Sequence, residues 1–242
     1  MPEFKKHNRL SFLSSVDQTA QFLKENGYID NEIEYYDSGH YGMVFTTSDP
    51  TKVLKITSSN QEINNARDMV GYKFDNVNYI SKVLPKETDV DVAIIVIEKL
   101  EPLPSKVKEP FENKIEPHIT SSVMSFVNKK ISKKEIDTFV NDIKTESMIL
   151  DIDLKNNIIN WVKDMNRYYF RFVYKLSYIS KNFAPNALKS LYTLHTIDPQ
   201  FIPDVVNGIV ELDSINIFIS DLHSENILFD NKSRKYKLID IQ

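Results

Sequence analysis

The segment from Asp221 to Asp240 constrains the fold most, because polar residues and two short apolar runs follow one another at close spacing. Asp221 and Asn226 are five residues apart, and Asp240 follows Asn226 by fourteen. Residues 227–229 and 236–239 are typical of strands, and the polar run between them is typical of a hairpin turn. Pairing of the two strands would bring Asp240 back beside Asn226. We therefore expect two carboxylates and an amide to converge on one small volume.

These three side chains suit phosphoryl transfer. Asp221 would accept the proton of an attacking hydroxyl group, with Asn226 and Asp240 as oxygen ligands of a magnesium ion held on phosphates. His223 lies inside the same segment. It would either approach the transferred phosphoryl group or pack under the loop, and the residues themselves favour neither role.

The same segment resembles the catalytic and metal-binding segments of the protein-kinase-like superfamily, which read H-R-D-L-x-x-x-N and D-F-G. This chain has Ile219-Ser220-Asp221 in place of His-Arg-Asp and Asp240-Ile241-Gln242 in place of Asp-Phe-Gly. Its D-L-H-x-x-N form is similar to that of small-molecule kinases of the aminoglycoside phosphotransferase type and of the protein kinases of small tailed phages. The resemblance implies ATP and Mg²⁺ as cofactors.

A second part of the resemblance is a short glycine-containing stretch. Two of the 5 glycines of the chain, Gly39 and Gly42, precede Val44 and resemble the superfamily's G-x-G-x-x-G-x-V loop, with an aspartate in place of the first glycine. The resemblance implies that Val44 covers the adenine. It also implies that the backbone of four residues holds the phosphates: Gly39, His40, Tyr41 and Gly42. An ordinary hairpin turn is the alternative interpretation.

A lysine follows in the next predicted strand. Residues 52–56 read Lys-Val-Leu-Lys-Ile and resemble the V-A-I-K strand, which implies that Lys55 binds the α- and β-phosphates. A lysine on the solvent face of a strand is the alternative. Residues 58–66 begin with helix-capping residues, so a helix should follow that carries an acidic partner for Lys55. Glu62 is the first candidate for this partner and Asp68 is the second.

Residues 91–97 form the most strongly apolar β-branched run and predict a central strand, and residues 77–83 predict another. The residues after the central strand resemble the hinge between the two lobes of a kinase. The resemblance implies that backbone groups near Glu98 and Leu100 bind the adenine edge. A buried strand that simply leaves its sheet is the alternative.

The middle of the chain, residues 106–199, lacks a motif but is helical in its apolar spacing. Helices are expected over residues 119–127, 134–148, 154–178 and 187–195, with a last helix over 201–211. The aromatic residues within 164–172, and Trp161, are expected in the core. Four nearby lysines form a solvated helix end or a docking patch for an acidic partner: Lys129, Lys130, Lys133 and Lys134.

Composition narrows the class of protein. The formal net charge of −4 argues against a dedicated nucleic-acid binder, and the chain has no cysteine for disulfides or thiolate metal sites. No run of eighteen apolar residues is present, and the first ten residues lack the apolar core of a signal peptide. We therefore expect a cytoplasmic protein without a membrane span, whose oligomeric state the sequence does not indicate.

The predicted fold is α+β and two-lobed, with an antiparallel sheet in an N-lobe and a mainly helical, truncated C-lobe. The N-lobe would be residues 1–100 and the C-lobe residues 101–242. Because the sequence stops two residues after Asp240, no activation segment is expected, and the C-lobe helices would precede the catalytic loop.

The resemblance implies an ATP- and Mg²⁺-dependent kinase. A minimal serine/threonine protein kinase with an unidentified protein substrate is the first hypothesis. A small-molecule kinase of the aminoglycoside phosphotransferase type is the second, and a non-catalytic nucleotide-binding pseudokinase is the third.

Overall fold

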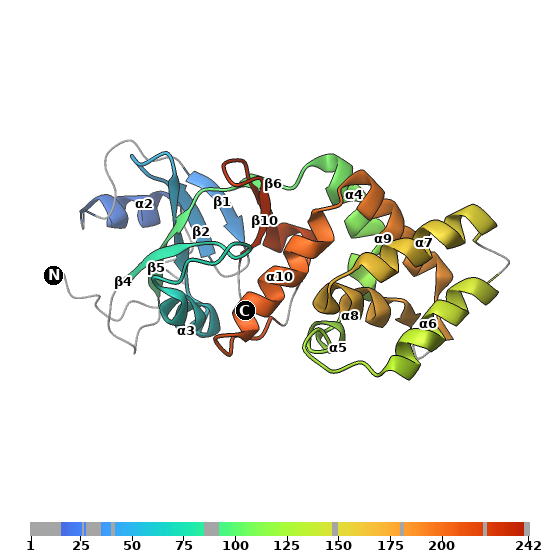
Figure 1. The fold of residues 1–242 in the computed structure, drawn as a ribbon. Coiled ribbons are helices and arrows are strands. Elements are labelled where there is room, and N and C mark those ends of the chain that lie inside the picture. Colours follow the sequence, from blue (N-terminus) through green and yellow to red (C-terminus); the bar gives the residue numbers. More distant parts are fainter. Residues whose placement is uncertain are drawn as a thin grey trace. The chain divides into compact units, whose positions relative to one another are not determined.

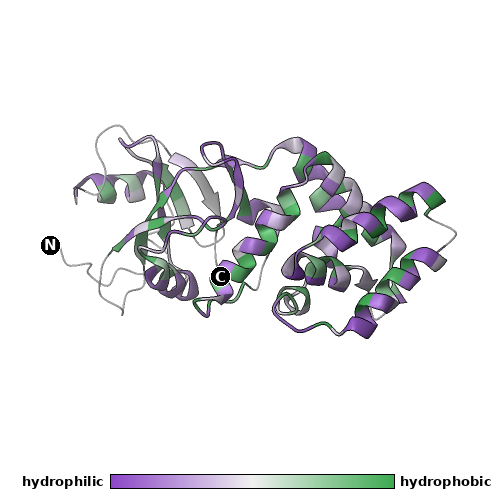
Figure 2. Cartoon of the chain, in the orientation of Figure 1, coloured by the Kyte–Doolittle hydropathy of each residue, from purple (hydrophilic) through white to green (hydrophobic). Residues whose placement is uncertain are grey.

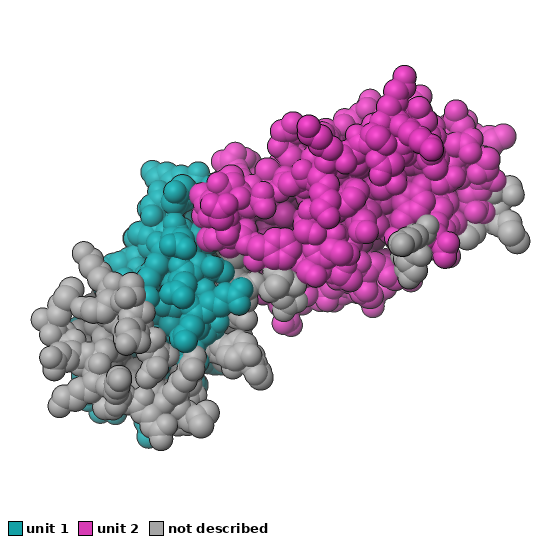
Figure 3. All heavy atoms as spheres, turned by 90° about the horizontal axis from the view of Figure 1, so that it is seen from below, with its two compact units in different colours: residues 1–74, 78–100, 240–242 teal, residues 75–77, 101–239 magenta. Residues whose placement is uncertain are grey.

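The computed structural model describes residues 16–25, 27, 35–39, 42–84, 92–146, 150–179, 182–219 and 222–239. The chain divides into two compact units, coloured separately in Figure 3. The first unit is drawn from residues 1–74, 78–100 and 240–242, and the second from residues 75–77 and 101–239. The α+β class is confirmed by a stranded first unit and a mainly helical second unit. The proposed lobe boundary stays a prediction.

The first unit is built on a five-stranded sheet in the order β1-β2-β3-β5-β4, with every neighbouring pair antiparallel (Figure 1). Its strands are β1 (Tyr35–Gly39), β2 (Gly42–Thr46), β3 (Lys52–Thr57), β4 (Ile80–Leu84) and β5 (Ala93–Glu98). The predicted strand over 77–83 starts later, at Ile80. Val77 instead forms a parallel bridge with Leu238.

The two faces of this sheet carry different helices, because successive side chains of a strand point to opposite faces. Leu54 and Ile56 of β3 belong to a core cluster that includes Leu23 of α2 (Val16–Glu25). Lys55 lies between them in sequence and faces the other side, toward α3 (Asn60–Met69). Helix α3 starts where predicted because the Ser59 hydroxyl accepts a hydrogen bond from the amide of Glu62, at 3.3 Å.

The second unit contains most of the helices. They are α4 (Ser105–Lys114), α5 (Ser121–Met124), α6 (Lys133–Thr145), α7 (Ile152–Asp164), α8 (Arg167–Leu176), α9 (Pro185–Ile197) and α10 (Phe201–Asp213). Two short 3₁₀ helices are η1 (Glu116–His118) and η2 (Ser224–Asn226). Figure 2 shows hydrophobic residues recurring along α10, whose side chains are largely buried. Among the described residues, no helix has the length and apolar character needed to cross a membrane.

Two helix predictions differ in extent from the structure. The helix expected over residues 154–178 is two helices, because Met165 is extended and Asn166 caps α8 by accepting hydrogen bonds from the amides of Tyr168 and Tyr169. The helix expected over 119–127 is only one turn, α5. Apolar spacing continues across such breaks, so it does not reveal them.

Aromatic rings form much of the core of the second unit. Phe139 of α6 packs edge-on against Phe170 and Tyr174 of α8, at centroid distances of 5.8 and 5.4 Å. Trp161 of α7 is 8% exposed and stacks against His195 of α9. The predicted core residues Trp161, Tyr169, Phe170 and Phe172 are buried, whereas Tyr168 is only half-buried.

The second unit also contains a small sheet in the order β10-β9-β6, from β6 (Glu101–Pro102), β9 (Ile227–Asp230) and β10 (Lys235–Leu238). Strands β9 and β10 pair in an antiparallel hairpin, with Ile227 opposite Leu238. The predicted hairpin is therefore confirmed. A second, two-stranded sheet joins β7 (Tyr178–Ile179) and β8 (Asn182–Phe183).

Candidate active site

Lys55 and Glu62 form a nearly buried ion pair in the first unit. The Lys55 Nζ atom lies 2.6 Å from Glu62 Oε1, and the two side chains are 14% and 6% exposed. Glu62 occupies the first turn of α3, where the helix dipole favours a carboxylate. Asp68, the second candidate partner, is exposed near the other end of α3. An ion pair this enclosed fixes the direction of the lysine side chain.

The glycine turn adjoins Lys55 through sheet register. Val44 of β2 lies directly opposite Lys55 of β3, so the two side chains share one face of the sheet. Gly39 and Gly42 pair at the end of β1 and β2, while His40 and Tyr41 lie outside the described residues. A Cβ atom on Gly42 would lie 2.3 Å from the Ile56 carbonyl oxygen. The close approach of β3 alone therefore requires glycine at position 42.

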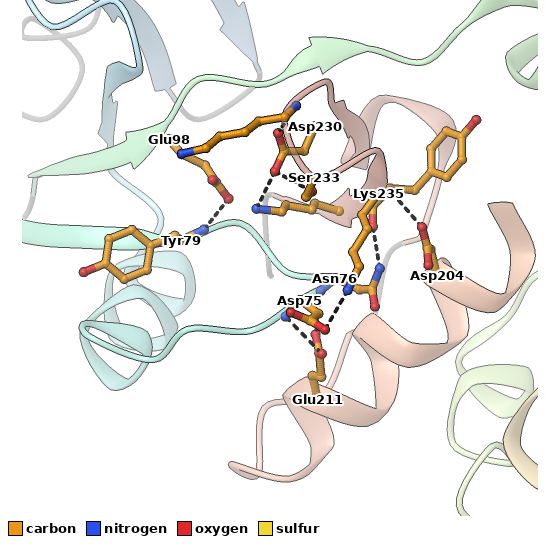
Figure 4. A network of polar contacts seen from close by, with 12 residues as sticks. Asp75, Asn76, Tyr79, Glu98, Asp204, Glu211, Asp230, Ser233 and Lys235 are labelled. Atoms are coloured by element: carbon orange, nitrogen blue, oxygen red, sulfur yellow. Dashed lines mark hydrogen bonds and ion pairs between the residues drawn. The ribbon is translucent and has the colours of Figure 1, made fainter. Parts of the chain in front are cut away.

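Glu98 and Leu100 lie where β5 ends. The Glu98 amide donates to the Tyr79 carbonyl at 3.2 Å, and its side chain accepts from the Tyr79 amide at 2.9 Å, as Figure 4 shows for the side-chain contact. The Lys99 amide donates to Thr51 at 2.8 Å. Leu100 is 5% exposed. The carboxylate of Glu98 thus ties this segment to the residues before β4, a contact that sequence analysis did not identify.

Asn226 lies at the end of η2 in the second unit and is 7% exposed. The Asn226 backbone amide donates to the His223 carbonyl at 3.0 Å. The Asn226 backbone carbonyl accepts from the Ile239 amide at 2.9 Å. The β9–β10 hairpin thus brings the residue before Asp240 into contact with Asn226. Asp221 and Asp240 themselves lie outside the described residues, so their convergence with Asn226 stays a prediction.

Two glutamates hold the segment that contains Asn226. The Ser224 hydroxyl donates to Glu112 Oε1 at 2.6 Å, and the Ser224 amide donates to Glu116 Oε2 at 2.8 Å. Glu112 also lies 3.5 Å from the Lys108 ammonium. Sequence analysis missed this clamp. The i,i+4 spacing of the glutamates was visible, but their partner is more than a hundred residues away in sequence.

A second polar network connects the β9–β10 hairpin with residues 75–76 and with α10 (Figure 4). The Asn76 side-chain amide donates to the Tyr236 backbone carbonyl at 3.0 Å, and the Asn76 backbone carbonyl accepts from the Leu238 backbone amide at 2.9 Å. Glu211 of α10 accepts from the amides of Asp75 and Asn76 at 3.1 and 2.9 Å. Burial raises the pKa of Glu211, against the effect of these hydrogen bonds. Residues 75–77 are thus held against α10 and β10 within the second unit.

Asp204 and Gly208 of α10 complete this network. Asp204 accepts from the Tyr236 amide at 2.9 Å, and burial raises the pKa of its carboxyl group. A Cβ atom on Gly208 would lie 2.6 Å from the Asn76 carbonyl oxygen and 2.8 Å from a Leu238 methyl carbon. Glycine at position 208 therefore allows the close packing of α10 against Asn76 and Leu238.

Other surface features do not involve the predicted site residues. A shallow hollow of about 600 Å³ lies along α6 and is lined by Lys133, Lys134, Asp137, Thr138 and Asn141. Within the described ranges, no group of three or more His, Asp or Glu side chains is placed to hold a metal ion. The proposed metal ligand Asp240 lies outside these ranges.

No protein-family model matches the chain, and no curated protein matches it. Solved structures do match. Aminoglycoside phosphotransferase APH(3'')-Id from Streptomyces rimosus is 13% identical with a TM-score of 0.37, over 94% of this chain and 77% of that one. The streptomycin–ATP complex of APH(2'')-IIa is 15% identical with a TM-score of 0.30, over 94% and 70%.

ADP-bound APH(2'')-Ib is 12% identical with a TM-score of 0.31, over 94% of this chain and 70% of that chain. The fold of this chain is given by its own elements: the five-stranded antiparallel sheet, the Lys55–Glu62 pair between β3 and α3, and the hairpin that follows Asn226. These are the elements that the sequence resemblance to the protein-kinase-like superfamily implies.

Proposed function

We propose that this chain is an ATP- and Mg²⁺-dependent phosphotransferase that transfers a phosphoryl group to an alcohol. The ion pair between Lys55 and Glu62 supports this most. A lysine inside a sheet normally extends to solvent, whereas this one is held on the sheet face beside Val44 by a carboxylate from a separate helix. Such a preorganised ammonium group suits phosphate oxygens, because its position is fixed before the ligand arrives.

Each remaining residue has a role in this proposal. Lys55 would neutralise the α- and β-phosphates, and the backbone between Gly39 and Gly42 would hold the phosphate chain. Backbone groups at Glu98 and Leu100 would bind the adenine edge. Asp221 would accept the proton of the acceptor hydroxyl group.

Asn226 and Asp240 would hold magnesium, which when bound neutralises charge on the phosphates. One amide oxygen and one carboxylate fit this ion, since Mg²⁺ keeps several waters and takes few protein ligands. The clamp from Glu112 and Glu116 onto Ser224 supports the role of Asn226, because it fixes the 3₁₀ turn to which both residues belong. His223 precedes that turn and is half-buried.

The acceptor has two candidates. A serine or threonine of a protein is the first, in keeping with a compact protein kinase. An alcohol of a small molecule is the second, and the D-L-H-x-x-N form of the segment from Asp221 to Asn226 favours it. The two candidate acceptors can be told apart by whether the phosphorylated product is a polypeptide or a small molecule.

The experiment offers γ-labelled ATP and Mg²⁺ to the purified chain, in separate reactions with a serine/threonine peptide mixture, an aminoglycoside mixture and no acceptor. We expect label on one acceptor class, and we expect Asp221→Asn to lower the transfer rate by at least about a hundredfold. Asp213→Asn, in an exposed carboxylate of α10, is the matched control and should keep the wild-type rate.

Label on peptides would assign a protein acceptor, and label on the small molecules would assign the alternative. Nucleotide binding without any transfer would identify a pseudokinase and refute the proposed activity. Equal loss of transfer in the Asp221 and Asp213 variants would remove Asp221 from its proposed role.

A further inference from the structure

Three cations recur at every fourth position of α8: Arg167, Arg171 and Lys175. Residues four apart lie on the same helix face, so the three form one stripe. At 1.5 Å of rise per residue, neighbouring cations are about 6 Å apart along the axis. The opposite face of α8 is buried through Phe172 and Val173. Helix α8 therefore presents a one-sided row of positive charge.

Aromatic rings fix the direction of these cations. The Arg167 and Arg171 guanidinium carbons lie 4.4 and 5.8 Å from the centroid of the Tyr168 ring. The Lys175 ammonium lies 5.5 Å from the centroid of Phe126, in the turn that follows α5. Contacts of this kind orient a cation without neutralising its charge.

The stripe continues into the segment between α5 and α6. Arg171 Nη1 donates to the Val127 carbonyl at 3.1 Å, which holds that segment against α8. Lys129 and Lys130 follow in the same segment, after Asn128, and are exposed. We call these five residues the basic surface: Lys129, Lys130, Arg167, Arg171 and Lys175.

Carboxylates do not neutralise the basic surface. Among the residues that the structure describes, none of its five cations is in an ion pair. Two acidic side chains of the flanking segments are engaged with uncharged donors. Glu135 accepts from the amide and hydroxyl of Ser132, and Asp213 accepts from the side-chain amide of Asn128 at 2.6 Å. The positive charge is thus available to a partner.

We propose that the basic surface is a docking site for an extended, acidic segment of a polypeptide partner. Side chains on one face of an extended chain repeat about every 6.6 Å, close to the 6 Å repeat of the α8 cations, so acidic residues at alternate positions match the stripe. The proposal goes beyond the proposed phosphotransferase activity and does not depend on it.

A polypeptide fits better than a nucleic acid. Single-stranded nucleic acid is bound largely by stacking bases on aromatic rings. The rings here are already engaged, because Tyr168 carries two guanidinium groups and Phe126 carries Lys175 and stacks on Tyr174. The net charge of −4 also opposes a long polyanion.

The test measures binding of a fluorescein-labelled peptide of alternating Glu and Ser to the full chain by fluorescence anisotropy. We expect saturable binding that weakens as salt is raised. Arg167→Gln with Arg171→Gln and Lys175→Gln should weaken it about tenfold. The charge-matched control replaces three exposed lysines of other helices, Lys144, Lys163 and Lys189, by Gln and should change affinity less than about twofold.

Because Arg171 also holds the Val127 carbonyl, a second variant leaves that contact intact. Lys129→Gln with Lys130→Gln changes only exposed side chains and should weaken peptide binding about threefold with an unchanged melting temperature. Absent binding of the acidic peptide, equal losses in the stripe and control variants, or tighter binding of a single-stranded oligouridine of the same charge would each overturn the proposal.

Discussion

The ammonium group of Lys55 lies 2.6 Å from the carboxylate of Glu62, so one strand and one helix of the first unit are joined by a nearly buried ion pair. The pair places the lysine on the sheet face that it shares with Val44. The contribution of this pair to stability can be separated from its contribution to phosphoryl transfer, because unfolding and enzyme kinetics are measured in independent experiments.

Glu62→Gln should lower both stability and transfer. The amide keeps one acceptor for Lys55 but removes the charge, so we expect a loss of about 1–3 kcal/mol in the free energy of unfolding. Transfer should fall about tenfold or more, since the lysine is no longer fixed. Urea unfolding and steady-state kinetics measure the two. Asp68→Asn, in an exposed carboxylate of the same helix, is the control and should change neither. Wild-type kinetics in Glu62→Gln would show that the pair is only structural.

Ser224→Ala should reduce turnover more than nucleotide affinity. It removes the hydroxyl that donates to Glu112 at 2.6 Å while the Ser224 amide keeps its bond to Glu116. We expect a stability loss of roughly 1–2 kcal/mol and a fall in kcat, because the turn that carries Asn226 is less fixed. Ser233→Ala, in the hairpin turn, is the matched control and should leave kcat unchanged. Equal kcat values in the two variants would contradict a positioning role for Ser224.

Gly208→Ala should destabilise the second unit. Alanine favours a helix over glycine by about 1 kcal/mol, so an open site would become more stable. At Gly208 the new Cβ meets the Asn76 carbonyl oxygen at 2.6 Å, a backbone atom that also accepts from Leu238. We expect a net loss of about 2 kcal/mol, measured by chemical unfolding. A gain in stability would mean that residues 75–77 do not pack against α10 as described.

Asp230→Asn should make the free energy of unfolding depend less on pH in acid. Burial opposes ionisation of Asp230, but hydrogen bonds from Ser233 and the Lys232 amide and the nearby Lys237 ammonium lower its pKa to about 2. A carboxyl group with a lowered folded-state pKa adds stability above its unfolded value of 3.8, and this is lost as the pH falls toward 2.

Urea unfolding of the wild type and of Asp230→Asn over that pH range measures the difference between them. The wild type should lose more stability than the variant as the medium is acidified. Parallel curves would show that the Asp230 carboxylate does not contribute in this way.

Local sequence signals predicted the elements around the candidate site well. Three elements are determined by residues close together in the sequence. Alternation predicts the strand that carries Lys55, a capping hydroxyl at Ser59 starts α3, and a polar turn closes the β9–β10 hairpin. Strand β4 was placed too early. Val77 has the apolar character of a strand residue but pairs with Leu238, far away in the sequence, which local pattern cannot reveal.

The sequence by itself indicated the strand of Lys55, the helix of Glu62, the hairpin after Asn226 and most of the aromatic core of the helical unit. Only the tertiary structure decided which carboxylate faces Lys55, that Glu112 and Glu116 hold Ser224, and that Asn76 and Glu211 fasten residues 75–77. The physical reason is range. Propensity, capping and turns act over a few residues, whereas these contacts join positions up to 160 residues apart and arise only when the elements pack.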